Sequence, residues 1–270
     1  MPLGTFERDI LRLLAQNRNP DSFVAGATVL HQAEKSPRIS RDIDLFHDAA
    51  EAISAAVQKD VATLQAHGFI VEIPHPQPAF QRGFVSQADR QTKIEWLYDS
   101  AFRFFPVEPD VDLGYRLNFW DAATNKLLAL AGRNEFRDYL DVLWLDQHHL
   151  SLGALAWAAS GKDAGLTPDF LLEEAQRNSR FAGEEVGKLE LAQPLDLVAL
   201  KRQWLAAISA AKTLVAALPP EELGCLYLDA RGVPRTPDPR HSEFPKWIRH
   251  FGSIKGAWPK LGEGSPLSES

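Results

Sequence analysis

The chain of 270 residues contains a single cysteine, Cys225, and no long uninterrupted run of apolar residues. One cysteine cannot form an internal disulfide or a cysteine-based zinc site, so the sequence favours a reducing compartment. No segment approaches the roughly 18 consecutive apolar residues of a membrane span. Charges at Glu7, Arg8, Asp9 and Arg12 interrupt any signal-peptide core. We therefore expect a cytoplasmic protein with no membrane partner.

An excess of basic residues is also missing. The chain has 29 Lys and Arg residues against 36 Asp and Glu residues, a net charge of −7. This acidity argues against a protein dedicated to duplex DNA, although a whole-chain average does not describe local patches. The hydrophobic fraction of 45% and the charged fraction of 24% are ordinary for a globular chain with a sizeable core.

The spacing of apolar residues divides the chain into a mixed α/β first half and a helical remainder. In the first half we expect helices at 5–17, 27–35 and 49–67, and strands at 23–25, 43–46, 69–73, 80–85 and 92–97. A long helix follows from 121 to about 150, and Ala- and Leu-rich helices continue to 217. The predicted fold class is α+β, with domains at 1–120 and 121–220 and an extension at 221–270.

Two aspartates stand out in the segment RISRDIDLF, which begins at residue 38. Side chains alternate along a strand, so Asp42 and Asp44 should face one side while Ile43 and Leu45 face the core. Neighbouring carboxylates repel unless a cation lies between them, and oxygen ligands favour Mg²⁺ or Mn²⁺. We expect the two aspartates to hold such a metal; the alternative is a pair of acids in a solvated turn.

A second Asp-x-Asp, Asp110 and Asp112, shows that the motif alone proves little. Only the first pair follows a strand, a glycine turn at Gly26 and a helix whose N–H groups could hold a phosphate. Glu95 lies in an otherwise apolar strand and is the candidate third ligand, because a buried acid is costly unless paired or metal-bound. The alternative is an edge-strand glutamate that faces water.

Three basic residues share one face of the predicted helix at 121–150 if it continues through Gly132: Lys126, Arg133 and Arg137. Such a stripe could contact the oxygens of a triphosphate. The alternative is a set of helix ion pairs between the arginines and Asp138 or Asp141. We expect His148-His149 to mark the end of this helix rather than a metal site.

Residues 231–260 depart from the acidic average, with seven basic and two acidic residues. Four aromatic residues interleave with them: Phe244, Trp247, Phe251 and Trp258. This pattern suits single-stranded or looped RNA; the alternative is a surface cover whose aromatics pack on the helical domain. We also expect a small hairpin around Arg231-Gly232 and a frayed end at 262–270.

Several of these motifs occur in one order: the strand–Gly–helix opening, RxSxDIDLF, a later strand acid and KLLALAGRNEFRDYLD. Together they resemble the nucleotidyltransferase AbiEii/AbiGii toxin family of the polymerase-β-like nucleotidyltransferase superfamily. The likeness covers roughly residues 20–146. Ala27 stands where members of the family usually have Gly or Ser, and Thr28 beside it carries a hydroxyl.

The resemblance implies a nucleotidyltransferase-like mixed sheet flanked by helices. It also implies that Asp42, Asp44 and Glu95 are metal ligands and, with Lys126, catalytic residues. The nucleotide-binding residues that it implies are Gly26, Ala27, Thr28, Arg38, Ser40, Lys126, Arg133, Arg137, Asp138 and Asp141.

These features predict a Mg²⁺-dependent nucleotidyltransferase that moves a nucleoside monophosphate from an NTP to an acceptor hydroxyl, with Glu95 or Asp42 accepting the hydroxyl proton. The resemblance further implies the toxin of a toxin–antitoxin or phage-defence pair, with tRNA as the acceptor and an antitoxin protein as partner. Two alternatives stay open: a small-molecule or protein acceptor, and a catalytically silent nucleotide-binding module, which Ala27 motivates.

Overall fold

The computed structural model of the chain describes residues 4–32, 42–75, 77–181 and 195–261. The chain divides into two compact units. Unit 1 comprises Met1–Ala101 and Pro106–Ala122, and unit 2 comprises Phe102–Phe105 and Ala123–Ser270. None of the helices in the described ranges is long and apolar enough to cross a membrane.

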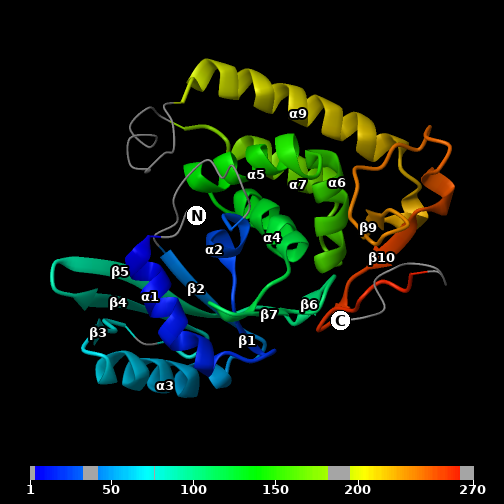
Figure 1. Cartoon of the computed structure of the whole chain (residues 1–270). Helices are drawn as coiled ribbons and strands as arrows, with labels where there is room; N and C mark the ends of the chain where they lie inside the picture. The colour runs from blue at the N-terminus through cyan, green and yellow to red at the C-terminus, as the bar shows by residue number, and fades with distance from the viewer. Residues whose placement is uncertain (1–3, 33–41, 76, 182–194, 262–270) are drawn as a thin grey trace. The chain divides into compact units, whose positions relative to one another are not determined.

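Unit 1 is built on a seven-stranded sheet with the order β3-β4-β5-β2-β1-β8-β7 (Figure 1). The strands are β1 Ser22–Val24, β2 Asp42–His47, β3 Ile70–Glu72, β4 Phe80–Gln87, β5 Arg90–Tyr98, β7 Glu108–Asp110 and β8 Gly114–Arg116. Strand β2 is parallel to β5 and β1 is parallel to β8, whereas the other pairs are antiparallel. The sheet is therefore mixed, and the predicted α+β class is confirmed.

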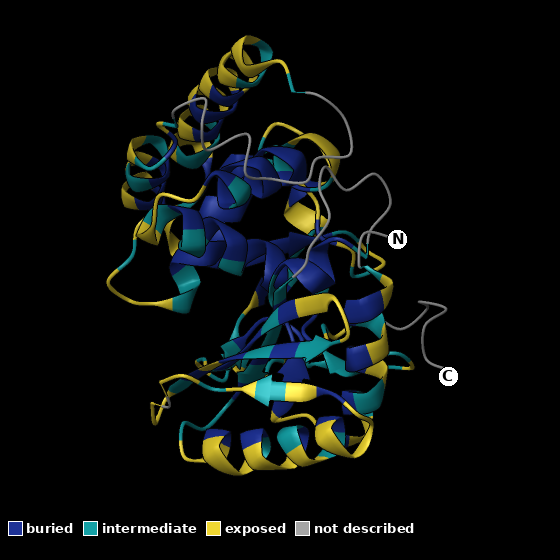
Figure 2. Ribbon diagram, turned by 90° about the vertical axis from the view of Figure 1, so that its left-hand side faces the viewer, coloured by how far each residue is buried: buried dark blue, intermediate teal, exposed yellow. Residues whose placement is uncertain are grey.

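Three helices accompany this sheet: α1 Thr5–Leu14, α2 Gly26–Leu30 and α3 Ala52–Ala66. Helices α1 and α3 contact each other and both contact β5; α1 also contacts β2, and α3 contacts β3 and β4. Helix α2 contacts β2. In Figure 2, α3 is the lowest helix, and its buried and exposed sides can be told apart along its length. The expected strands and the helices at 5–17 and 49–67 are found within a few residues of their predicted positions. The helix expected at 27–35 is found as Gly26–Leu30, and residues 33–35 lie outside the described residues.

A buried polar cluster fastens the sheet to α3. The carboxylate of Asp60 accepts hydrogen bonds from the Arg18 guanidinium at 2.7 Å, from Asn17 Nδ2 at 2.8 Å and from Trp96 Nε1 at 2.8 Å. Arg18 and Asp60 side chains are fully buried. A buried charge is tolerated only when it is paired and hydrogen-bonded, and here one carboxylate accepts from three side chains, two at residues 17–18 and one on β5.

Unit 2 is mainly helical. Its helices are α4 Phe119–Gly132, which begins in unit 1, α5 Phe136–His148, α6 Leu152–Ala159, α7 Pro168–Arg177 and α9 Leu197–Ala217. Every residue of α6 is buried, and this helix contacts α5, α7 and α9. Two small two-stranded sheets complete the unit: β9 Cys225–Leu228 with β10 Ile248–Phe251, and β6 Phe102–Arg103 with β11 Ser253–Ile254.

The prediction of one continuous helix at 121–150 is wrong. Helix α4 ends at Gly132 and α5 begins at Phe136. Gly and Asn are weak helix formers, and this chain has both at the break. The amide of Asn178 also donates hydrogen bonds of 3.0 and 2.9 Å to the carbonyls of Leu130 and Ala131, and so satisfies the end of α4. As expected, α5 ends at His148.

The late hairpin is only partly as predicted. A turn is present, because Gly232 N donates to Asp229 O at 2.9 Å and a bridge joins Leu228 to Pro234. The main partner of β9, however, is β10. Buried Cys225 packs here in an apolar cluster with Trp157, Leu218, Tyr227 and Phe244. The end at 262–270 lies outside the described residues.

His47 gives unit 1 an acid-sensitive point. It is fully buried, and neither ring nitrogen has a hydrogen-bond partner within the described part of the chain. Burial, with a smaller contribution from the charge of Arg18, lowers its pKa from 6.5 to about 4, against smaller opposing effects of Asp60 and Asp48. Below pH 6.5, His47 therefore binds a proton in the unfolded chain, whereas in the native state it stays neutral until the pH approaches 4.

We expect the stability present above pH 6.5 to be lost as the pH falls towards 4, by up to about 3 kcal/mol. The substitution His47→Leu should flatten this pH dependence, which chemical denaturation at several pH values measures. His67→Gln, at an exposed histidine after α3, is the control and should leave the wild-type slope unchanged. An equal slope for wild type and His47→Leu would contradict this account.

Candidate active site

The acidic residues of β2 and β5 share one face of the sheet. In the parallel register, Asp42 pairs with Lys93 and Asp44 pairs with Glu95. Burial alternates along β2, with Ile43 and Leu45 fully buried and both aspartates partly exposed. The structure thus brings together the three acids that the sequence singled out, and it places the two aspartates on a strand rather than in a turn.

Glu95 does not lie at a sheet edge. Strand β5 runs between β4 and β2, and Glu95 is 8% exposed. Its Oε1 accepts from Arg82 Nε at 2.6 Å, and its Oε2 lies 3.2 Å from Lys93 Nζ. The alternative of an edge-strand glutamate facing water is therefore wrong, and this carboxylate is held by two cations.

Lys93 also reaches the first aspartate, because its Nζ lies 3.2 Å from Asp42 Oδ2. One ammonium group thus bridges acids on two strands. Neither Lys93 nor Arg82 was among the site residues predicted from the sequence. The signal for Lys93 was present, since it lies two residues before Glu95 and so shares its strand face. Arg82 enters only through the β4–β5 register, which pairs it with Glu95.

Gly26 lies directly against this acidic face. Its backbone has a φ of +66°, and a Cβ at this position would collide with the carboxylate of Asp44. The neighbouring Ala25 N donates to Asp44 O at 3.0 Å. Glycine is thus required here both for the left-handed backbone and for the close approach.

The two residues after Gly26 are largely turned inward. Ala27 is buried, and Thr28 is fully buried with its hydroxyl donating to Asp42 O at 3.3 Å. This hydrogen bond ties α2 to the start of β2. Arg38 and Ser40, which the resemblance assigned to the nucleotide, lie outside the described residues.

The acidic face has the chemistry of a divalent-cation site. Within the described ranges, no group of three or more His, Cys, Asp and Glu side chains has the spacing of a metal cluster. The Lys93 ammonium, however, lies between Asp42 and Glu95, so a positive charge is already favoured at this point. Carboxylate oxygens are the donors that Mg²⁺ and Mn²⁺ prefer, and the residues present fit such an ion.

The second predicted cluster lies in unit 2. Lys126 Nζ is 2.9 Å from Asp138 Oδ1 and 3.2 Å from Asp141 Oδ2, and Arg133 Nε is 2.7 Å from Asp138 Oδ2. Both aspartates are fully buried. Burial opposes ionisation of Asp138, but the charges of Lys126 and Arg133 outweigh it, so the pKa of Asp138 lies below its usual range.

The break between α4 and α5 changes the predicted basic stripe. Because Arg133 lies in the break, Lys126, Arg133 and Arg137 do not share one face of a single helix. Lys126 and Arg133 instead converge on Asp138, while Arg137 Nε lies 3.8 Å from Glu135 Oε2. Of these contacts, Arg133–Asp138 is one of the ion pairs of the alternative interpretation.

The second Asp-x-Asp is structural. Asp110 ends β7, its Oδ1 accepts from Asp112 N and Leu113 N, and its Oδ2 lies 3.4 Å from Arg116 Nε. Asp112 pairs with Arg12 at 2.8 Å. Asp110 and Asp112 thus hold a turn and two arginines, and the metal role of Asp42 and Asp44 stays a prediction.

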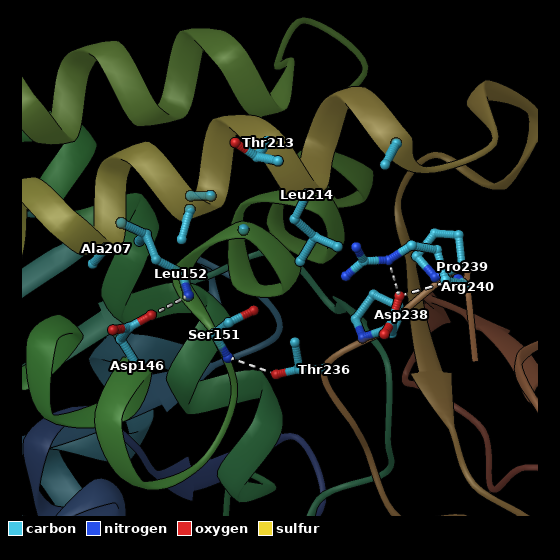
Figure 3. Close-up of a pocket in the computed structure, with 15 residues that line it drawn as sticks. Asp146, Ser151, Leu152, Ala207, Thr213, Leu214, Thr236, Asp238, Pro239 and Arg240 are labelled. Atoms are coloured by element: carbon cyan, nitrogen blue, oxygen red, sulfur yellow. Dashed lines mark hydrogen bonds and ion pairs between the residues drawn. The ribbon is translucent and has the colours of Figure 1, made fainter.

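A pocket of about 560 Å³ lies elsewhere, wholly within unit 2 (Figure 3). Ala207, Ala211 and Leu214 of α9 form an apolar wall, and the residues around 236–240 line it as well. Asp146 accepts from Leu152 N at 2.7 Å at one end. None of the predicted site residues lines this pocket, so it is not the candidate active site.

The sequence model of one protein family, the nucleotidyl transferase AbiEii toxin of type IV toxin–antitoxin systems, matches residues 10–216. The chain belongs to this family. It is therefore an AbiEii-type nucleotidyltransferase, and the resemblance drawn from the sequence motifs is confirmed. No curated protein matches the chain.

Two solved structures show the same fold. MenT4, a nucleotidyltransferase toxin from Mycobacterium tuberculosis H37Rv, is 14% identical, with a TM-score of 0.52; the match covers 80% of this chain and 83% of MenT4. A Helicobacter pylori protein described as a nucleotidyltransferase is 20% identical, with a TM-score of 0.50, and the match covers 79% and 94%. At these identities the likeness concerns the fold of this AbiEii-type chain alone.

We expect Gly26→Ala to disable the acidic face. A left-handed alanine costs about 1–2 kcal/mol, and the added methyl group must also displace the Asp44 carboxylate. Nucleotidyl transfer should fall by at least about tenfold, the equivalent of 1.4 kcal/mol, as measured by pyrophosphate release.

The matched control is Gly132→Ala, because a Cβ there meets nothing within 4 Å. It should keep full activity and leave thermal stability equal or slightly higher, since alanine is the better helix former. Full activity in Gly26→Ala would contradict the role assigned to this close approach.

Proposed function

We propose that this AbiEii-type enzyme transfers a nucleoside monophosphate from an NTP to a hydroxyl of an RNA acceptor, with tRNA as the predicted target, in a Mg²⁺-dependent reaction. We further propose that it acts as the toxin of a pair whose antitoxin is a protein. The observation that carries the proposal is the acidic face of β2 and β5, with Gly26 packed against Asp44.

Asp42, Asp44 and Glu95 would hold the cation. When bound, Mg²⁺ would offset the charge of the triphosphate and lower the pKa of the attacking hydroxyl. The chain itself supplies the orientation. The Thr28 hydroxyl supports the start of β2, Gly26 allows close approach to Asp44, and Arg82 anchors Glu95.

Lys126 is proposed as a contact for nucleotide phosphate. Its Nζ is directed by two buried acids, Asp138 and Asp141, and its side chain is 9% exposed. An ammonium held by two carboxylates keeps its charge and its direction, which suits a point-charge contact to a phosphate oxygen. The roles of Arg133 and Arg137 stay predictions.

The base-rich segment 231–260 gives limited support to an RNA acceptor. At least four of its seven bases have carboxylate partners in the described part of the chain, in the pairs Arg235–Asp229, Arg240–Asp238, Lys246–Glu243 and Arg249–Glu222. Phe244 is buried and packs against Tyr227, as the cover interpretation expects. Phe251 and Trp258 remain 48% and 59% exposed, and exposed aromatic rings can stack on unpaired bases.

The decisive substitution is Asp44→Asn, which keeps the shape of the side chain and removes its charge. Incubation with each labelled NTP, Mg²⁺ and total RNA should label RNA with the wild type. Loss of the metal ligand should cost several kcal/mol of transition-state stabilisation, so labelling should fall at least about 100-fold. Retention of labelling in Asp44→Asn would refute the mechanism.

Asp112→Asn is the matched control. It changes the same residue type in the other Asp-x-Asp, where Asp112 only pairs with Arg12 on the surface. Surface pairs of this kind contribute about 0–1 kcal/mol, so labelling should be unchanged. If the label entered the protein itself or an added small hydroxyl compound, and none entered RNA, the proposed RNA acceptor would be wrong. The nucleotidyltransferase activity would still stand.

A further inference from the structure

Lys93 occupies an unusual place on the acidic face. Its ammonium lies 3.2 Å from Asp42 on β2 and 3.2 Å from Glu95 on its own strand. The register explains this position, because Lys93 is the β5 residue paired with Asp42 and lies two residues before Glu95. Lys93 thus bridges the two strands that carry the proposed metal ligands.

The other cation of this face, Arg82, is placed differently. Its side chain is 52% exposed, and it contacts the carboxylate of Glu95 from β4, which lies between β3 and β5. Lys93 is only 21% exposed. Charges near water are screened, whereas a partly buried charge between two acids acts strongly on both. Lys93 contacts both Asp42 and Glu95, and it therefore offsets the repulsion between them more directly than Arg82 does.

We propose that Lys93 is an internal counter-cation that competes with the divalent metal for the position between Asp42 and Glu95. The proposal rests on the proposed function, in which these acids hold Mg²⁺. Two positive centres cannot share that position, because like charges at a few ångströms repel strongly. The long flexible lysine stem lets the ammonium withdraw without moving the strand.

This competition has a consequence for substrate binding. The free metal must displace Lys93 and should bind weakly. When the metal binds together with a triphosphate, the displaced Lys93 ammonium can pair with the negative charge of the phosphates. Metal and NTP should therefore bind with positive coupling, and removal of the Lys93 charge should weaken that coupling.

The test measures Mn²⁺ binding to the full chain by electron paramagnetic resonance of the free ion, without nucleotide. Lys93→Met keeps most of the aliphatic stem and removes the charge. We expect about tenfold tighter Mn²⁺ binding than in the wild type, the equivalent of 1.4 kcal/mol. The double variant Lys93→Met with Asp44→Asn should lose this gain, which would locate it at the acidic face.

Arg82→Met is the matched control, because it removes a positive charge from the same Glu95 without touching the position between the strands. It should change Mn²⁺ affinity far less than Lys93→Met does. Equal tightening by both variants would reduce the effect to net charge and overturn the proposal. Unchanged or weaker Mn²⁺ binding in Lys93→Met would overturn it as well.

Thermal unfolding separates this role from a purely structural one. In EDTA, Lys93→Met should melt below the wild type, because Asp42 and Glu95 lose the ammonium that lies between them. Millimolar Mg²⁺ should raise the melting temperature of this variant more than that of the wild type. If the melting temperature of Lys93→Met lay equally far below that of the wild type with and without Mg²⁺, Lys93 would act through packing alone. That result would refute the proposal.

The outcomes also separate the two proposals. If the wild type bound Mn²⁺, Asp44→Asn lost this binding and Lys93→Met kept it unaltered, the role of Lys93 would be overturned. The proposed function would still stand. If wild type, Lys93→Met and Asp44→Asn bound Mn²⁺ equally poorly, even with a non-hydrolysable NTP, both proposals would fail.

Discussion

The parallel pairing of β2 with β5 is the constraint on which the site depends. It sets Asp44 opposite Glu95 and Asp42 opposite Lys93, and it sets Ile43 opposite Ile94 on the other face. A slip of one residue would turn the acids into the core and the apolar residues outward. Burial of the apolar side chains under α1 and α3 therefore places the charged side chains together on the opposite face. The same strand register is required for core packing and for the geometry of the site.

Much of this site could be predicted from the chain because strand alternation is a local rule. Asp44 and Glu95 each lie between two apolar neighbours, and Asp42 lies two residues before Asp44, which fixes the face of each acid once a strand is assumed. Arg82 could not be predicted in this way. Its contact with Glu95 depends on how β4 pairs with β5, and register between strands is set by the turn and by packing rather than by the strand's own sequence.

The helical unit shows a second limit. Gly132 and Asn134 are local signals for a helix end, but the amide that caps α4 comes from Asn178, 46 residues further along. The basic stripe was derived from helical periodicity, which assumes that the helix continues. Once α5 starts afresh at Phe136, Asp138 and Asp141 can turn towards Lys126. The full burial of these two acids is a property of tertiary packing, and composition gives no indication of it.

The cluster around Asp60 also bears on how this chain can diverge. Trp96 is held inward by its hydrogen bond to Asp60, and strand alternation then directs its neighbour Glu95 to the opposite face. Loss of Arg18 or Asp60 alone would leave an uncompensated charge in the interior. Joint replacement of both by apolar residues can leave the stability unchanged. These positions should consequently be exchanged among relatives as a set, and engineered variants of the catalytic unit should treat them as one block.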